Sequence, residues 1–292
     1  MNTSADLTAQ PFRFGDIEVI TVADGSLTFP LPDGLVRNAT RNQVNEALEA
    51  AGMKRDEMKI VFNPVVLRTP GRTLLFDTGN GESADRGPDG PGLFGKNLTS
   101  AGISPDQIDL VVITHFHGDH IGGLLLADGS PAFPNADIVV PEAEWTFWMS
   151  EDERSRAKGG RLEENFANVR RVLTPLKDRI AQCKGDASVA PGVVAMSTPG
   201  HTPGHTSFVV SSGAAKLFIQ GDVTNHPALF VRHPGWHLGF DMDPDLAERT
   251  RRTVYEMLLA ERMPVQGFHF PFPSRGFVEH DGDGYRLSNR RI

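Results

Sequence analysis

Several features that would restrict function are scarce in this chain. It has a single cysteine, Cys183, which rules out an internal disulfide framework and suits a reducing compartment. Residues 1–10 are polar and show no secretory signal, and no apolar stretch approaches membrane-spanning length. The net charge of -8 gives no electrostatic reason to expect a polyanionic partner. We therefore expect a cytoplasmic protein that binds neither nucleic acid nor membrane.

The remaining composition is that of a globular protein, with 39% hydrophobic and 23% charged residues. Apolar patterns and turn signals locate the elements. Strands are predicted at 16–22, 59–68, 72–76, 108–113, 136–140, 192–196, 207–210, 216–219 and 265–268, and helices at 42–51, 142–149 and 166–180. Loops or exposed segments are predicted at 29–34, 81–95 and 151–160. A further helix should begin at Asp243-Pro244, a capping carboxylate followed by a first-turn proline, and stop before Pro264.

Strands and helices alternate without a linker-like break or a visible internal repeat. This order is typical of an α/β fold. A chain of 292 residues is long enough to bury a large core. We predict one domain over residues 1–292, with residues 1–15 as an N-terminal extension.

The densest cluster of reactive side chains directly follows the apolar strand at 108–113. Three histidines and one aspartate stand within six residues: His115, His117, Asp119 and His120. Crowded histidines are costly as cations, and a divalent metal that keeps them neutral is the simplest explanation. His115 and His117 would point the same way on an extended segment, because side chains repeat with period two. The alternative is a polar loop with accidental histidines, but four potential ligands rarely arise at this spacing without a metal.

Three more candidate ligands share one setting, since each lies just beyond a predicted strand. They are His201, Asp222 and His269. Polar groups gathered at one edge of an α/β fold are where such folds usually place chemistry. Singly, each has a structural explanation: an aspartate after a strand is usually a cap or turn residue, and His269 among aromatics could be a buried, hydrogen-bonded ring. Taken with the first cluster, we predict that all three are metal ligands.

The order His115-x-His117-x-Asp119-His120, followed by three single ligands, resembles the dinuclear metal signature of the metallo-β-lactamase superfamily. The resemblance implies a four-layer αββα sandwich with the metals at one edge of two sheets. It also implies the partition of the ligands: one zinc ion on His115, His117 and His201, a second on Asp119, His120 and His269, and Asp222 bridging both. Manganese, iron or cobalt are chemically possible in place of zinc.

Two further residues are expected to support the ligands. Asp77, in the segment Phe76-Asp77-Thr78-Gly79, would hold a ligand imidazole or the metal-site loop in place. His205 could do the same, although a loop histidine that satisfies backbone groups is an equally good explanation.

Two metal ions about 3.5–4 Å apart would share a hydroxide and generate a nucleophile near neutral pH. They would also polarise a carbonyl or phosphoryl oxygen. The catalytic residues would be Asp222, which bridges the metals, and Asp119, through which the leaving oxygen could take a proton. We therefore expect a hydrolase of a small ester-like molecule. A lactone or carboxylic ester is favoured, and an organophosphate triester is a possible side activity.

The C-terminal part, 240–244 and 267–273, resembles the branch that holds methyl parathion hydrolase and related lactonases. Asn225 stands where acyl-homoserine lactonases carry a tyrosine, so an assisting phenol is absent or comes from elsewhere; the chain has only Tyr255 and Tyr285. The alternatives are a thioesterase of glyoxalase II type, or a di-iron redox enzyme. Related hydrolases often form dimers, so a homodimer is possible.

The substrate pocket should be apolar. Phe116 and Phe270, which neighbour predicted ligands, and Trp236 are candidates for its walls, together with Asn225. The alternative explanation for each aromatic residue is ordinary core packing.

Overall fold

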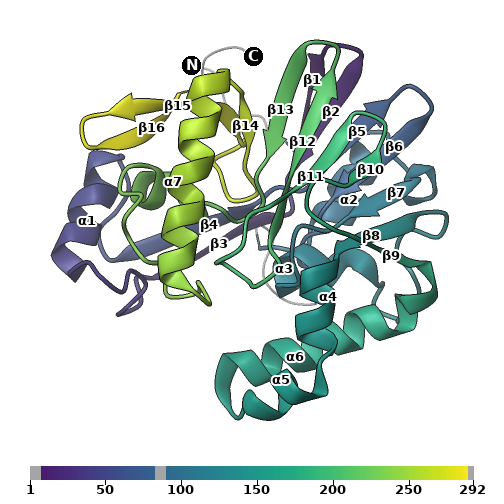
Figure 1. Cartoon of the computed structure of the whole chain (residues 1–292), viewed down its shortest axis with the longest axis horizontal. Coiled ribbons are helices and arrows are strands. Elements are labelled where there is room, and N and C mark those ends of the chain that lie inside the picture. The colour runs from purple at the N-terminus through teal and green to yellow at the C-terminus, as the bar shows by residue number, and fades with distance from the viewer. Residues whose placement is uncertain (1–7, 83–89, 289–292) are drawn as a thin grey trace. The chain divides into compact units, whose positions relative to one another are not determined.

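Two seven-stranded sheets organise the chain (Figure 1). The computed structural model describes residues 8–82 and 90–288. It separates them into two units: the chain up to Gly25 with Phe62–Lys184, and Ser26–Val61 with the chain from Gly185 onward. Each unit contains one of the seven-stranded sheets. The single domain expected from the sequence stays a prediction.

The sheet of the first unit has the order β1-β2-β5-β6-β7-β8-β9. Its strands are β1 (Ala9–Phe14), β2 (Ile17–Val22), β5 (Val65–Thr69), β6 (Arg72–Phe76), β7 (Leu110–Val112), β8 (Asp137–Pro141) and β9 (Ile180–Cys183). β1, β2, β5 and β6 pair antiparallel, whereas β6, β7, β8 and β9 run parallel. The carboxyl ends of the parallel strands therefore meet at one edge of the sheet.

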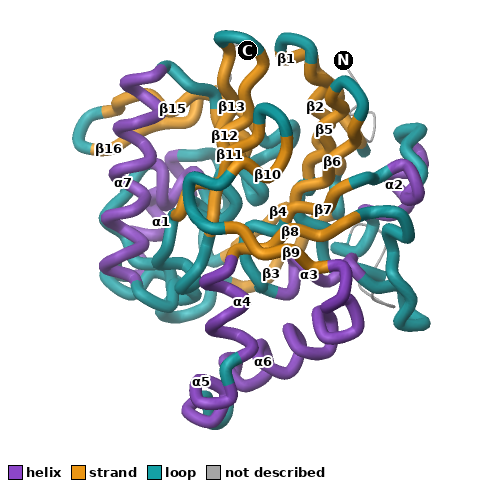
Figure 2. The backbone as a smooth tube through the Cα atoms, turned by 45° about the vertical axis from the view of Figure 1, so that its right-hand side comes forward, coloured by secondary structure: helices purple, strands orange, loops and turns teal. Residues whose placement is uncertain are grey.

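Helices of the first unit connect its parallel strands. They are α2 (Phe94–Ser100), η1 (Pro105–Gln107), α3 (Gly118–Ile121), η2 (Gly122–Leu124), α4 (Glu142–Met149), α5 (Glu151–Arg156), α6 (Gly160–Leu173) and η3 (Thr174–Arg179). Figure 2 shows α4 next to β9, with α6 and α5 beyond it. Trp148 of α4 and Phe166 of α6 are buried and pack together, with ring centroids 4.8 Å apart and ring planes tilted by 58°. This contact holds α6 against α4.

The sheet of the second unit has the order β10-β11-β12-β13-β14-β15-β16. Its strands are β10 (Ser188–Ala190), β11 (Val193–Ser197), β12 (Thr206–Ser212), β13 (Ala215–Ile219), β14 (Val265–Gln266), β15 (Arg275–Asp281) and β16 (Gly284–Ser288). A separate two-stranded sheet joins β3 (Gly25–Pro30) to β4 (Glu57–Phe62), and the helices are α1 (Arg41–Ala50), η4 (Pro227–Val231) and α7 (Pro244–Glu261). β13 and β14 pair parallel, and the other neighbouring strands of this sheet pair antiparallel.

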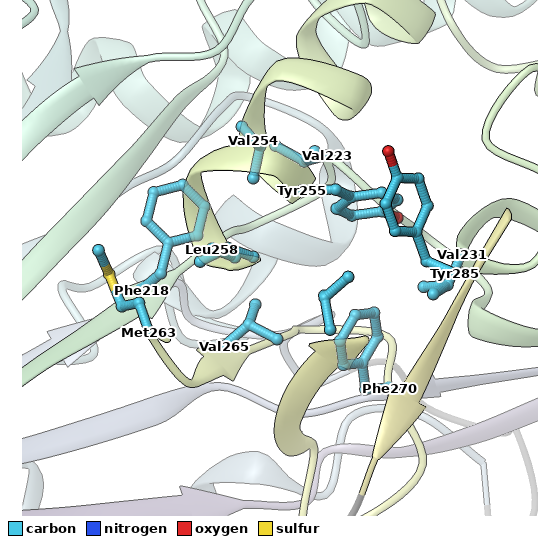
Figure 3. Packing of buried hydrophobic residues seen from close by; sticks show 11 residues of the cluster. Phe218, Val223, Val231, Val254, Tyr255, Leu258, Met263, Val265, Phe270 and Tyr285 are labelled. Atoms are coloured by element: carbon cyan, nitrogen blue, oxygen red, sulfur yellow. The ribbon is translucent and has the colours of Figure 1, made fainter. Parts of the chain in front are cut away.

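Helix α7 provides much of the core of the second unit (Figure 3). Val254, Tyr255 and Leu258 of this helix pack with Phe218 of β13 and Val265 of β14. Burying an apolar side chain of this size stabilises a fold by about 1.5–3 kcal/mol. The predicted start of the helix is confirmed, because the Asp243 carboxylate accepts a hydrogen bond from the Leu246 amide at 2.9 Å. The helix therefore has a fixed first turn.

Some predicted element boundaries are wrong. The strand predicted at 59–68 is two strands, β4 and β5, which belong to different sheets; Pro64 lies between them and lacks the amide proton that a continuous ladder needs. The helix predicted at 166–180 spans Gly160–Leu173 and tightens to a 3₁₀ turn at Thr174–Arg179, which contains Pro175. The segment predicted as exposed at 151–160 is mostly exposed and forms α5.

Three further segments differ from their predicted form or lie partly outside the described residues. Of the segment 1–15, residues 9–14 form β1, which pairs with β2, and residues 1–7 lie outside the described residues. In the loop predicted at 81–95, residues 83–89 lie outside them as well, and α2 begins at Phe94. The predicted loop at 29–34 begins inside β3. Among the described residues, no helix is long and apolar enough to cross a bilayer.

Candidate metal centre

The loop that carries the first group of candidate ligands follows β7, and it is tied to the end of the neighbouring parallel strand β6. Asp77 comes directly after β6, and Thr114 comes two residues after β7. The Thr114 amide donates to Asp77 Oδ1 at 2.9 Å, and its hydroxyl donates to Asp77 Oδ2 at 2.9 Å. Asp77 has a φ of 56°, in the left-handed region that a short polar side chain tolerates. Asp77 therefore ties the start of the histidine loop to the neighbouring strand.

Asp77 also orients one predicted ligand. His120 Nδ1 lies 2.8 Å from Asp77 Oδ2, so this nitrogen donates to the carboxylate and Nε2 is the ring nitrogen available to a metal. The His120 carbonyl accepts from the Thr78 amide at 2.8 Å and from its hydroxyl at 2.9 Å. A Cβ at Gly123 would stand 2.1 Å from the Thr78 carbonyl oxygen, so this close approach requires glycine.

The ligands of the first unit have the separations expected of atoms that share a metal. His115 Nε2 lies 3.1 Å from His117 Nδ1, and Asp119 Oδ2 lies 3.6 Å from His120 Nε2. His115 and His120 also offer ligand atoms within 4.8 Å of each other. Two nitrogens bound to a tetrahedral zinc at about 2.0–2.1 Å would be about 3.3 Å apart. The side chain of Asp119 is 24% exposed, whereas His115 and His120 are fully buried.

Glu144 supports the same loop and was missed by sequence reasoning. This fully buried residue of α4 accepts from the Phe116 amide at 3.0 Å and from Trp148 Nε1 at 2.8 Å. It fixes the main chain between His115 and His117. The available signal was an acidic residue just after β8, the parallel neighbour of β7, but the sequence alone does not show that these strands are adjacent.

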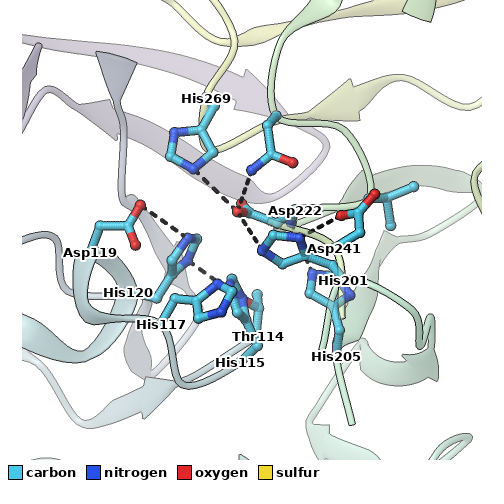
Figure 4. A network of polar contacts seen from close by, with 12 residues as sticks. Thr114, His115, His117, Asp119, His120, His201, His205, Asp222, Asp241 and His269 are labelled. Carbon is cyan, nitrogen blue, oxygen red and sulfur yellow. Dashed lines mark hydrogen bonds and ion pairs between the residues drawn. The ribbon is translucent and has the colours of Figure 1, made fainter. Parts of the chain in front are cut away.

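The second group of ligands depends on strand register. β13 and β14 pair in parallel with Ile219 opposite Gln266, and Asp222 and His269 each follow three residues later. Asp222 Oδ2 consequently lies 3.2 Å from His269 Nε2 (Figure 4). His269 Nδ1 donates to the Val61 carbonyl at 2.8 Å. This ring, like His120, is anchored through Nδ1 and offers Nε2.

His201 is held by the segment that leads into α7. Its Nδ1 donates to Asp241 Oδ1 at 2.8 Å, and its Nε2 lies 3.3 Å from Asp222 Oδ2. The amide of Met242 donates to the His201 carbonyl at 3.1 Å. Gly200 has a φ of +130°, and a Cβ there would stand 2.3 Å from the Ala247 nitrogen. The loop therefore lies against the helix start too closely for any other residue.

The electrostatic surroundings of His201 attract a cation. Burial lowers the pKa of its imidazole, but the hydrogen bonds and charges of Asp222 and Asp241 outweigh burial and raise the pKa to about 9. A metal ion that binds here takes the place of that proton.

A buried ion pair between α7 and the segment before it supports His201 and was also missed by sequence reasoning. Arg251 Nη2 lies 3.4 Å from Asp241 Oδ2, and both side chains are about 98–99% buried. The remaining donors of Arg251 bind the carbonyls of Val223 at 3.0 Å and of Pro234 and Trp236, each at 2.9 Å. Arg251 thereby links Asp241, which holds His201, to the segment that follows Asp222. An arginine in a helix gives no sequence signal that it will be buried.

His205, a predicted supporting residue, and Asn225, a predicted pocket residue, both contact Asp222. His205, which is fully buried, donates from Nδ1 to the Thr198 carbonyl at 3.1 Å and accepts at Nε2 from the Asp222 amide at 2.9 Å. The side-chain amide of Asn225 donates from Nδ2 to Asp222 Oδ2 at 2.7 Å. Tyr255 and Tyr285 belong to the buried core of this unit. Neither tyrosine replaces the phenol that Asn225 lacks.

The predicted pocket walls stay predictions. Phe116 and Phe270 are fully buried, and Phe270 packs in the core with Val265 and Tyr285, which favours the core-packing explanation. Trp236 is partly buried and stacks on His233, with ring centroids 4.1 Å apart.

Comparison with known families fits these observations. The family model of the metallo-beta-lactamase superfamily matches residues 63–262, more than half of the chain. The chain belongs to the metallo-β-lactamase superfamily. Its predicted fold class, an α/β sandwich of this type, and its predicted class as a metal-dependent hydrolase are confirmed.

Individual relatives agree with that assignment. N-acyl homoserine lactonase AiiA of Bacillus thuringiensis subsp. kurstaki is 28% identical over 219 residues, which are 68% of this chain and 76% of that protein. A solved structure of AidC, a dizinc quorum-quenching lactonase, superposes with a TM-score of 0.90 at 23% identity over 97% of this chain and 98% of that one. A solved structure of hydrolase AbOPH gives a TM-score of 0.88 at 24% identity, over 98% of both chains. At these identities the two structures show the fold alone.

Proposed function

We propose that the two groups of ligands together bind two zinc ions and that the protein hydrolyses a lactone. The observation that carries this proposal is the common anchoring of the ligand imidazoles. His120, His201 and His269 each donate Nδ1, to Asp77, to Asp241 and to the Val61 carbonyl, and each keeps Nε2 for a metal. Histidines that ligate metals characteristically make this second hydrogen bond, which fixes the tautomer and the ring orientation.

The donor set itself fits zinc. Five imidazoles and two carboxylates supply the borderline nitrogen and oxygen ligands that zinc accepts. Asp222 Oδ2 lies 3.3 Å from His201 Nε2 and 3.2 Å from His269 Nε2, so one carboxylate neighbours ligands assigned to both ions. This position supports the proposed bridging role of Asp222.

In hydrolysis, water adds to the carbonyl carbon, the ring carbon–oxygen bond breaks, and the leaving alkoxide takes up a proton to give a hydroxy acid. Two bound zinc ions would lower the pKa of water towards neutrality and stabilise negative charge on the carbonyl oxygen. The side chain of Asp119 is partly open, at 24% exposure, and we assign to it the delivery of the proton to the leaving oxygen. Asp77, Asp241 and Glu144 hold the ligand loops while the charge changes.

A lactone is favoured over other esters because the curated relatives that align with two thirds of this chain are N-acyl homoserine lactonases. The names of these relatives indicate a small cyclic ester as their substrate. At position 225, where acyl-homoserine lactonases are expected to carry a tyrosine, this chain has asparagine. A panel of lactones that differ in ring size and acyl chain would identify the best substrate.

The test is turnover by the zinc-loaded protein on N-acyl homoserine lactones, an aryl ester, a glutathione thioester and a phosphotriester. We expect the highest kcat/KM on a lactone and its loss in His115→Ala, while His280→Ala, a change at an exposed histidine of β15, keeps the rate. The proposal is wrong if lactone turnover is negligible while the thioester is hydrolysed well, which would instead indicate a thioesterase.

A further inference from the structure

Three nitrogen atoms of the second unit converge on one carboxylate oxygen, Asp222 Oδ2. His201 Nε2 and His269 Nε2 lie 3.3 Å and 3.2 Å from it (Figure 4). Asn225 Nδ2 lies closer, at 2.7 Å. Both imidazoles donate Nδ1 to other partners, so the Nε2 atoms that face Asp222 are the nitrogens left for a metal. The nitrogen of the Asn225 amide carries only N–H donors, so it binds the carboxylate and no metal.

The main chain on both sides of Asn225 is held by hydrogen bonds. Before it, the Thr224 carbonyl accepts from Gln220 Nε2 at 2.9 Å, and the Thr224 hydroxyl contacts the hydroxyl of Tyr255. These three residues are fully buried. After it, the His226 carbonyl accepts from two amides of η4, at 3.1 Å and 2.8 Å. Asn225 itself is only partly buried, but its side chain projects from a fixed segment.

The main chain of Asp222 is fixed as well, but this does not fix its carboxylate. His205 Nε2 accepts from the Asp222 amide at 2.9 Å. The last torsion of an aspartate side chain is broad, so the carboxylate plane can rotate unless a partner holds one of its oxygens. The Asn225 amide holds Oδ2 from three residues away. An ionised carboxylate has about four acceptor sites, so this hydrogen bond leaves sites for metal ions.

The charge of the Asn225 side chain suits this role. A lysine or arginine in its place would neutralise Asp222 and compete with a metal for the carboxylate. A neutral amide orients the carboxylate and leaves its negative charge available. The hydrogen bond is nevertheless strong, because a bond to an ionised acceptor is roughly twice as strong as one between neutral groups.

We propose that Asn225 is a positioning residue for the metal centre, whose amide holds the Asp222 carboxylate with Oδ2 toward His201 and His269. Asn225 then serves a ligand, in place of the role in the pocket wall that was predicted from the sequence. This inference rests on the proposed function, because it requires that Asp222 binds zinc. Residues that hold a metal ligand in this way typically change metal affinity or activity by about 10- to 100-fold.

The first test is the zinc affinity of Asn225→Leu, measured by competition with a chelator. Leucine is close to asparagine in size and shape but has no N–H donor. We expect the affinity to fall about 10- to 100-fold. In excess zinc, kcat on a lactone should fall while KM stays nearly unchanged, because Asn225 acts through Asp222 and not on the substrate. If this variant does not fold, Asn225→Ala replaces it in the same measurements.

A matched control is Asn45→Leu in the same unit. Asn45 also donates from Nδ2 to an aspartate, Asp56 Oδ1, at 3.0 Å, and its Oδ1 accepts from the Asp56 amide at 2.9 Å. Asp56 is not a candidate ligand. Asn45→Leu should therefore lower the melting temperature but leave the zinc affinity of the folded protein unchanged. An equal loss of zinc affinity in both variants would overturn the inference, because it would show a general effect of instability.

A double variant tests whether Asn225 acts through Asp222. Two residues that act as one unit are not additive, so Asn225→Leu should have no further effect once the Asp222 carboxylate is gone. The zinc that remains bound to Asp222→Ala should have the same affinity in Asp222→Ala with Asn225→Leu. A further fall of about 10-fold or more in the double variant would overturn the inference.

These outcomes separate the inference from the proposed function. A wild type that binds zinc and hydrolyses no lactone would refute the lactonase function, while the zinc affinities of the variants would still decide the role of Asn225. Zinc affinity of Asn225→Leu within twofold of the wild type would refute the positioning role. A rise in KM with unchanged zinc affinity would also refute it, because that result assigns Asn225 a contact with substrate.

Discussion

The two units hold their ligands in different ways. In the first unit, four ligands stand within six residues on one loop, and Asp77 fastens that loop by hydrogen bonds to Thr114 and His120. In the second unit, His201, Asp222 and His269 come from three loops separated by 21 and 47 residues in the sequence. Strand register and a buried ion pair between Arg251 of α7 and Asp241 hold them. The first group depends on local spacing, whereas the second depends on the folded core.

This difference has an energetic consequence. The Asp77 contacts are hydrogen bonds of a carboxylate to main-chain and side-chain donors of the same loop. One carboxylate oxygen of Asp241 instead accepts a hydrogen bond from His201, and the other faces the buried guanidinium of Arg251. A buried charge that loses its partner is strongly destabilising. The ligand geometry of the second unit should therefore be the more sensitive of the two to substitution.

The largest expected effect is that of Arg251→Met. The change takes the guanidinium away from the buried Asp241 carboxylate, which keeps only its contact with His201, and removes three hydrogen bonds to loop carbonyls. Removal of one partner from a buried ion pair costs about 3–5 kcal/mol, which denaturant unfolding would measure. Arg252→Met is the matched control, since Arg252 pairs with Glu248 on a partly exposed face and should cost less than about 1 kcal/mol. Equal losses in the two variants would contradict the special role of the buried pair.

Acid should destabilise the second unit through His226. The folded pKa of about 4 lies below the usual 6.5, so between these values the unfolded chain binds more protons than the folded one. The contribution of neutral His226 is complete above pH 6.5 and is lost as pH falls towards 4. The total is roughly 3 kcal/mol. As pH falls from 6.5 towards 4, the unfolding free energy of His226→Phe should therefore exceed that of the wild type by a growing amount. A difference that stays constant with pH would exclude the effect.

Replacement of the carboxylates behind the histidines compares the two groups directly. Asp241→Asn and Asp77→Asn each remove the charge that orients a ligand imidazole, so each should weaken zinc binding by about 10- to 100-fold in competition with a chelator. Asp241→Asn should have the larger effect, because it also unpairs Arg251. Asp243→Asn, which preserves the helix cap in the same segment, should bind zinc like the wild type. The reverse order of the two effects would contradict the comparison.

The smallest expected effect is that of Glu144→Gln in the first unit. The amide keeps an oxygen acceptor for Phe116 and Trp148 but loses the negative charge. Hydrogen bonds to a charged group are roughly twice as strong as neutral ones, so a loss of about 1 kcal/mol in unfolding free energy is expected. Glu142→Gln, at the exposed start of the same helix, should be neutral within about 0.5 kcal/mol. A loss as large as that of Arg251→Met would show that both groups depend on buried charge.

Sequence reasoning found the candidate ligands because each follows an apolar strand or stands in a short dense motif. His115 and His117 do converge, as period-two spacing predicts. It did not find Asp241, Arg251 or Glu144, because their roles follow from helix packing and from which strands are neighbours. It also joined β4 to β5 into one strand, since a continuous apolar pattern does not show where the chain changes sheets.

The most direct test of the account is the metal content of the purified chain, measured by elemental analysis alongside lactone turnover. The account predicts two zinc ions per chain in the wild type. In Asp222→Ala, whose altered side chain can no longer bridge, it predicts fewer than two ions and the loss of turnover. A wild type that binds no transition metal, or one that keeps full lactone turnover after complete removal of metal, would contradict it.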